Sequence, residues 1–258
     1  MLGKELRAAL LSGRRVYGTL IVSPSPKWPE AVGRCGLDFV FIDTEHVALD
    51  REKLSWMCHT YRAMGIAPIV RILAPDPFQA TMMLDAGASG IIAPYIETAA
   101  QVRALAGAVK LRPVKGSYLQ NKLHGTAEFP GTLQEYLDQV NGGNVLVVNI
   151  ESVPAMEALD EILAVPGLDA VLIGPHDLTC SLGIPEQYDH PRFKEAVSQI
   201  IKKAREAGKG AGIHYSFGLA EQMAWIKEGA NLVVHSSDIT LFSEALRRDL
   251  QALRQMAE

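Results

Sequence analysis

The sequence predicts a (β/α)8 barrel of the TIM-barrel type, and three observations support this fold class. Short apolar runs recur along the 258 residues, and a longer segment with helical periodicity follows each run. The runs are apolar throughout rather than alternating, as expected for strands of a parallel sheet whose outside is covered by helices. Eight such pairs in one chain of this length match the repeat number of the barrel.

The expected strands are separated by helical segments that often stop at a glycine, as at Gly65, Gly87 and Gly208. The competing fold is an open doubly wound sheet, which predicts a glycine-rich turn after the first strand. The segment IVSPSPKWP at 21–29 is not such a turn, so the barrel is favoured. The eight expected strands lie at 17–22, 38–43, 67–72, 90–95, 144–151, 169–174, 210–215 and 231–236.

Two segments depart from the βα rhythm of a single barrel domain that we expect over 1–258. The N-terminal stretch MLGKELRAALLSGRR has polar residues throughout, so it predicts an extra amphipathic helix and not a signal peptide. Residues 111–143 form a long connection before the fifth strand. A connection of that length is more often functional or interfacial than idle.

Charge and composition exclude several partners. The net charge of −4 argues against nucleic acid, which basic surfaces bind. No apolar stretch approaches the roughly 18 residues of a membrane span. The three cysteines are widely spaced and form no CxxC pair, which favours a reducing compartment over a disulfide framework. We therefore expect a soluble cytoplasmic protein with no membrane partner.

Polar side chains follow the ends of several predicted strands, as the stretch FVFIDTEHVALD at 39–50 illustrates. Because the carboxyl ends of barrel strands meet at one mouth, where barrel enzymes keep their chemistry, these side chains are expected to converge. They are Asp43, Glu45 and His46 after the second strand, Arg71 on the third, Asn149 and Glu151 on the fifth, His176 and Asp177 after the sixth, His214 on the seventh, and His235 and Asp238 on the eighth.

Each of these residues also has a structural interpretation. Asp177 could be a helix cap or turn former. Arg71 could form a stabilising ion pair with Asp43 or Glu45. His46 could be a hydrogen-bonded residue at the edge of the core, and His214 and His235 are weaker functional candidates.

Taken together, the strand-end residues point to chemistry on an enolate. Glu151 and Asp177 could bind one hard divalent cation, such as Mg²⁺ or Mn²⁺, which needs few protein ligands. Arg71 could stabilise an oxyanion, and His46 beside a carboxylate could carry a proton. The backbone amides near His176 and Asp177 could bind a carboxylate at the start of a short helix.

The motifs FIDTEH, VRI, NIES and LIGPHDLTCSLG, in this order and spacing, resemble the HpcH/HpaI aldolase family. The resemblance runs from about residue 17 to 245. It implies a class II aldolase that uses a divalent cation (Mg²⁺, Mn²⁺ or Co²⁺), bound by Glu151 and Asp177, to act on pyruvate-type enolates.

The resemblance also implies roles for the other residues. Arg71 would stabilise the enolate oxygen, His46 with Asp43 would perform acid–base chemistry through a water, and Asn149, His176 and Asp177 would contact the substrate. Family members are typically hexamers that exchange a C-terminal helix, so a homo-oligomer, hexamer or trimer, is expected. The sequence departs from the family at Asn149 (often Gln), at His176 (often Ala) and at Lys115 (Arg in the family).

The expected activity is the reversible cleavage of a 4-hydroxy-2-keto acid to pyruvate, or a close 2-keto acid, and an aldehyde. Two alternatives stay open. A coenzyme A thioester lyase of the malyl or citramalyl type uses related metal chemistry but needs a basic, aromatic-lined cleft. The second alternative is a non-catalytic barrel that binds a keto acid. The presence of the whole set of acidic, arginine and histidine side chains weighs against it, because binding alone would not require the set.

Overall fold

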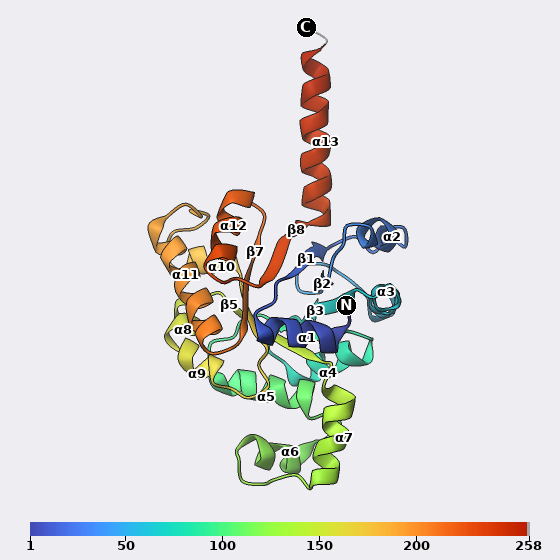
Figure 1. The fold of residues 1–258 in the computed structure, drawn as a ribbon, viewed down its shortest axis with the longest axis vertical. Coiled ribbons are helices and arrows are strands. Elements are labelled where there is room, and N and C mark those ends of the chain that lie inside the picture. Colours follow the sequence, from blue (N-terminus) through green and yellow to red (C-terminus); the bar gives the residue numbers. More distant parts are fainter. Residues whose placement is uncertain (257–258) are drawn as a thin grey trace.

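Eight parallel strands close into one barrel in the order of the sequence, with β8 paired to β1 (Figure 1). The computed structural model describes residues 1–256. The predicted fold class is therefore confirmed. The strands are β1 (Val16–Ile21), β2 (Phe39–Asp43), β3 (Ala67–Arg71), β4 (Gly90–Ala93), β5 (Val145–Ile150), β6 (Ala170–Ile173), β7 (Gly210–Tyr215) and β8 (Leu232–Ser237).

The helices alternate with the strands, as the sequence pattern predicts, with one addition before β1 and two before β5. They are α1 (Gly3–Ser12), α2 (Trp28–Gly33), α3 (Arg51–Ala63), α4 (Pro77–Asp85), α5 (Ala99–Lys110), α6 (Gly116–Leu123), α7 (Gly131–Asn141), α8 (Val153–Glu157), α9 (Leu159–Leu163), α10 (Pro175–Ser181), α11 (Pro191–Glu206), α12 (Leu219–Lys227) and α13 (Asp238–Gln255). Within residues 1–256, no helix has the length and apolarity that crossing a membrane requires.

Helix ends follow local chemistry. Side-chain oxygens of Asp50, Asp76 and Thr98 accept hydrogen bonds from backbone N–H groups in the first turns of α3, α4 and α5. Gly65 and Gly208 have φ values of 74° and 70°, a left-handed conformation that glycine adopts without a Cβ clash.

Both faces of the apolar strands are buried because one face points into the core inside the barrel and the other into the core beneath the helices. Phe39, Phe41 and Ile69 belong to the cluster inside the barrel, whereas Val40 and Ile42 belong to the outer cluster beneath the helices. The expected N-terminal helix closes one end of the inner core: α1 contributes buried leucines and packs against β1, β5 and β7.

The long connection at 111–143 contains two helices, α6 and α7, which pack against α5. Figure 1 shows this pair at the opposite end of the molecule from α13, which projects away from the barrel. The connection is therefore an ordered insertion rather than a structureless loop.

Candidate active site

The first part of the site is an arginine held by two acidic side chains. Asp43 and Arg71 are register partners on β2 and β3. Arg71 donates from Nε to Asp43 Oδ1 at 2.8 Å and from Nη2 to Oδ2 at 2.7 Å, and its Nη1 lies 3.1 Å from Glu45 Oε2. Burial alone would raise the pKa of Asp43, but the hydrogen bonds and charge of Arg71 hold it below its usual value. The ion pair considered from the sequence is present, with both carboxylates.

These contacts do not use all the N–H donors of the Arg71 guanidinium. A guanidinium has five N–H donors, and two of them, on Nε and Nη2, donate to Asp43. Nη1 lies beside Glu45 Oε2, an oxygen that accepts no hydrogen bond among residues 1–256, so Arg71 keeps N–H donors for a substrate oxygen. Since its side chain is only 12% exposed, its direction is fixed before any ligand arrives.

The second part of the site is a pair of carboxylates on neighbouring strands. Glu151 follows β5; its Oε1 accepts from the Tyr95 N–H at 2.8 Å and its Oε2 from Asn149 Nδ2 at 2.9 Å. A Cβ placed on Gly174 would lie 2.6 Å from Glu151 Oε2 and 3.5 Å from Asp177 Oδ2. Glu151 and Asp177 therefore face the same point beside Gly174, and both line a cavity of about 350 Å³.

The charges around this point fit a divalent cation. Burial raises the pKa of Glu151, and the charges of Asp177 and Glu45 oppose its ionisation further. The buried Oδ1 of Asn149 has no hydrogen-bond partner among residues 1–256, so it adds an unsatisfied acceptor beside Glu151. No three His, Cys, Asp or Glu side chains in that range cluster tightly enough to bind a metal ion. The site thus offers two carboxylates and leaves other positions to water and ligand, as Mg²⁺ sites commonly do.

Tyr95 is a site residue that the sequence analysis missed. It follows β4 with a φ of 54°, a left-handed conformation that is uncommon for a residue with a side chain, and this turns its N–H toward Glu151. Hydrogen bonding to Glu45 and the charge of Glu45 raise the pKa of Tyr95 to about 12. Its hydroxyl stays protonated at neutral pH. Tyr95 therefore contacts the carboxylate half of the site through its backbone N–H, while its side chain is influenced by Glu45 of the arginine half.

The remaining predicted site residues lie around this centre. His46 is 64% exposed, and the carboxylate near its ring is that of Glu45, 3.9 Å from Nε2. His176 and Asp177 lie in the first turn of α10, where their N–H groups have no intrahelical acceptor. Lys115 precedes α6 in the insertion and does not line the cavity of Glu151 and Asp177.

The two weaker histidine candidates have structural contacts. His214 Nε2 lies 3.0 Å from the carbonyl oxygen of Ser236, and its ring meets the edge of Phe41. His235 Nδ1 lies 2.8 Å from Gln222 Oε1. Asp238 accepts from the N–H groups of Val22 and Ser23 at 3.0 Å, which anchors the loop after β1.

Acid is expected to destabilise the protein partly through His214, because burial lowers the pKa of this ring from 6.5 to about 4. Between these values the unfolded chain binds a proton that the folded chain does not bind. The neutral His214 ring therefore stabilises the folded protein above the pKa of the unfolded chain. This contribution to the free energy of unfolding is lost as the pH falls toward the pKa of the folded chain, and about 2 kcal/mol is gone near pH 5. Urea unfolding near pH 8 and pH 5 should show a smaller pH effect in His214→Gln than in the wild type. An equal effect in both proteins would contradict this role.

A closed parallel barrel with a cluster of acidic side chains and a buried arginine at the carboxyl ends of its strands has the organisation of an α/β-barrel enzyme. The sequence model of the HpcH/HpaI aldolase/citrate lyase family matches residues 17–245, so the chain belongs to this family. The predicted resemblance is confirmed.

Individual relatives agree with the family. The chain is 31% identical over 252 residues to the 2-keto-3-deoxy-L-rhamnonate aldolase of Klebsiella pneumoniae, covering 97% of this chain and 93% of the relative. It is similar to the crystal structure of an HpcH/HpaI aldolase from Desulfitobacterium hafniense DCB-2, with a TM-score of 0.83, 26% identity and 96% coverage of both chains. The citrate synthase SbnG has the same TM-score, 0.83, at 28% identity and 98% coverage of both chains. The predicted enzyme class, a carbon–carbon lyase of the aldolase type, is confirmed.

Proposed function

We propose that the chain cleaves a 4-hydroxy-2-keto acid reversibly to pyruvate, or a close 2-keto acid, and an aldehyde at the mouth of the barrel. The observation that carries this proposal is the meeting of Glu151 and Asp177 beside Gly174, with Arg71 near enough to be influenced by the charge of Glu151. The name of the Klebsiella relative favours a 2-keto-3-deoxy sugar acid as the substrate.

Glu151 and Asp177 are the residues that would bind a divalent cation, with Mg²⁺, Mn²⁺ and Co²⁺ as the candidates. When bound, such an ion supplies a Lewis acid that offsets negative charge on the keto-acid oxygens. The N–H groups of His176 and Asp177 would hold the substrate carboxylate, and the amide of Asn149 would contact the keto-acid half.

The chain's own groups account for the movement of protons and charge. His46, exposed at the mouth, takes the proton of the C4 hydroxyl through a water, with the acidic residues Asp43 and Glu45 nearby. The C3–C4 bond then breaks, the electron pair forms the C2–C3 double bond, and the C4 oxygen becomes the aldehyde. The N–H donors of Arg71 that are not bonded to Asp43 stabilise the negative charge on the C2 oxygen, and a proton returns to C3.

His46→Ala should lower kcat for cleavage on the order of 10²-fold, because a positioned general base contributes about that factor. His124→Ala is a matched control, since His124 is also exposed and lies at the end of α6. The kcat of both variants is measured with saturating Mg²⁺. Cleavage by His46→Ala at the wild-type rate would remove His46 from the mechanism.

A substrate panel tests the proposed function. The protein is incubated with 2-keto-3-deoxy sugar acids and Mg²⁺ or Mn²⁺, and pyruvate and aldehyde are measured by mass spectrometry. Cleavage that EDTA abolishes and a divalent cation restores is expected. Turnover of malyl- or citramalyl-coenzyme A alone would favour the thioester lyase. Failure to exchange the C3 protons of pyruvate for deuterium would favour a non-catalytic binding barrel.

We also propose that α13 packs on another copy of the chain. Among its described residues only Asp238 is buried, and a row of apolar side chains is exposed along it. An apolar hollow of about 500 Å³ lies beside its first turn, lined in part by Trp28, Val32 and Leu37. A long helix with an uncovered apolar face indicates an interface, and an exchanged helix would fill such a hollow. The exposed apolar row comprises Ile239, Leu241, Phe242, Leu246, Leu250 and Leu253.

Phe242→Asp combined with Leu246→Asp should reduce the mass of the particle in light scattering from that of a hexamer or trimer to that of the monomer. The charges would oppose burial of the apolar row. Arg248→Ala on the same helix is the control, since Arg248 is exposed and pairs with Asp249. A wild-type protein that is monomeric, or a double variant of unchanged mass, would contradict the proposal.

A cytoplasmic location completes the proposal. Cys35, Cys58 and Cys180 are all free in the described part of the chain. Burial raises the pKa of Cys58 to about 12, so this thiol stays unreactive. Both features suit a reducing compartment.

A further inference from the structure

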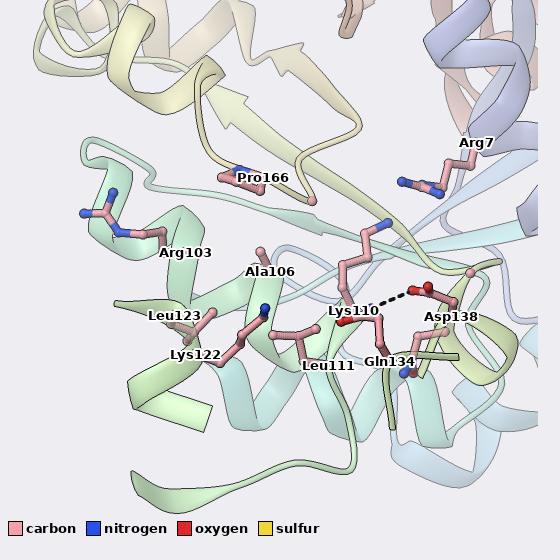
Figure 2. Close-up of a pocket in the computed structure, with 13 residues that line it drawn as sticks. Arg7, Arg103, Ala106, Lys110, Leu111, Lys122, Leu123, Gln134, Asp138 and Pro166 are labelled. Atoms are coloured by element: carbon pink, nitrogen blue, oxygen red, sulfur yellow. Dashed lines mark hydrogen bonds between the residues drawn. The ribbon is translucent and has the colours of Figure 1, made fainter. Parts of the chain in front are cut away.

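A second cavity lies at the opposite end of the barrel from the active site. It has a volume of about 470 Å³ and lies among α1, α5, α6, α7 and the turn at Pro166 and Gly167 (Figure 2). Asp169, whose carboxylate contacts two cationic lining residues, directly precedes β6. The cavity is therefore on the side where strands begin, whereas Glu151 and Asp177 lie where strands end.

One wall of this cavity carries more positive charge than its surroundings neutralise. Arg7 Nε donates to Asp169 Oδ1 at 2.7 Å, and Lys110 shares the same carboxylate. Asp169 is 1% exposed and also accepts the N–H of Leu146 at 2.8 Å, so its oxygens are occupied. Figure 2 shows Arg7 and Lys110 pointing toward each other.

Two further cations line the cavity. Lys122 of α6 pairs with Glu128, whose side chain is 83% exposed and therefore weakly held. Arg103 of α5 is exposed at the rim. Burial lowers the pKa of Lys110, as expected for a buried ammonium group that shares its one carboxylate with Arg7. An anion at this wall would offset the surplus charge.

Two lining residues of α7 offer different chemistry. Gln134 Nε2 donates to Asp138 Oδ1 at 3.0 Å, and both residues lie on α7. The second oxygen of Asp138 can accept hydrogen bonds from hydroxyl groups but would repel an anion. Ala106, Leu123 and Pro166 also line the cavity and add an apolar surface.

We propose that this cavity binds a small phosphorylated sugar or polyol. The hydroxyl groups would contact Gln134 and Asp138, and the phosphate would be held by the cations of the lining, Arg7, Arg103, Lys110 and Lys122. Its volume is that of a small-molecule site. The inserted helices α6 and α7 supply one of the cations and both hydroxyl-binding side chains. This assigns a role to the long connection that aldol chemistry does not use.

Isothermal titration calorimetry of the Mg²⁺-loaded protein with glucose 6-phosphate tests the proposal. We expect a submillimolar Kd, at least about tenfold weaker binding of inorganic phosphate, and no heat with glucose. Lys122→Glu and Arg103→Glu should each weaken glucose 6-phosphate binding about tenfold or more, a loss of about 1.4 kcal/mol. Lys203→Glu is the matched control, because Lys203 forms a similar exposed ion pair with Asp160 and lies outside the cavity.

Glu151→Gln locates the binding. It removes a proposed cation ligand at the other end of the barrel, so glucose 6-phosphate should bind this variant as it binds the wild type. Loss of binding in Glu151→Gln would place the phosphate at the active site and overturn the proposal. So would the absence of binding to the wild type, or equal binding by the wild type and Lys122→Glu. The readout is heat of binding, so the result is independent of aldolase activity.

Discussion

Glu151→Gln is expected to lower kcat/KM for aldol cleavage on the order of 10³-fold or more at a limiting Mg²⁺ or Mn²⁺ concentration, a loss of about 4 kcal/mol. The substitution keeps the shape of the side chain and removes one of the two carboxylate charges that meet beside Gly174. Cation affinity, measured by calorimetry, and kcat/KM should fall together. Asp177→Asn should behave in the same way.

The melting temperature shows whether the loss of activity in Glu151→Gln is caused by unfolding. Burial and the charges of Asp177 and Glu45 disfavour ionised Glu151 in the metal-free protein. Glu151→Gln should therefore match or exceed the wild-type melting temperature in EDTA. Glu97→Gln is the control, because Glu97 lines the same cavity but accepts from the hydroxyl of Ser152 at 2.7 Å. A Glu151→Gln protein with wild-type cation affinity would contradict the assignment.

Arg71→Gln is expected to lower kcat about 10²- to 10³-fold, because it removes the donors that would stabilise the oxyanion. It should also destabilise the protein by about 3–5 kcal/mol, because Asp43 and Glu45 would be left as buried charges without their partner. Urea unfolding and steady-state kinetics measure the two effects separately.

A double variant distinguishes the structural role from the catalytic one. Arg71→Gln combined with Asp43→Asn removes the guanidinium and one of the carboxylates that it neutralises. Stability should recover in part, whereas kcat should stay low. Recovery of kcat together with stability would show that Arg71 acts only as an ion-pair partner.

The barrel could be predicted because its strands are buried on both faces and so are apolar throughout. The observed strands lie within one or two residues of the expected ranges at most ends; β4 is the largest difference, ending at Ala93 rather than residue 95. That strand ends before Pro94, which has no N–H for the strand ladder, and Tyr95 then adopts a left-handed backbone conformation, which an apolar run does not reveal.

The same conformation explains why Tyr95 was missed as a site residue. The backbone N–H of Tyr95 contacts Glu151, and this contact does not depend on which side chain stands at position 95. The sequence therefore does not reveal it. An aromatic residue at the end of a strand is also most simply interpreted as part of the hydrophobic core. Arg71, Glu151 and Asp177 could be predicted because each is a charged residue at the end of an apolar strand or in the turn that follows it, and their proposed roles remain predictions.

The cationic cavity could not be predicted because residues distant in the sequence form it. Arg7, Lys110 and Asp169 meet only when α1 closes the barrel by packing against β1, β5 and β7. The length of the connection at 111–143 indicates a functional or interfacial segment, but it does not predict which residues would meet there. Its helical structure follows from packing against α5 rather than from the βα rhythm.

A crystal soaked with Mn²⁺ and pyruvate, measured for anomalous scattering, tests the central claim most directly. We expect one manganese peak coordinated by Glu151 and Asp177, with pyruvate oxygens completing the coordination and Arg71 within hydrogen-bonding distance of the keto oxygen. Density for pyruvate with no manganese between these two carboxylates, in crystals of protein shown to be active, would contradict the account.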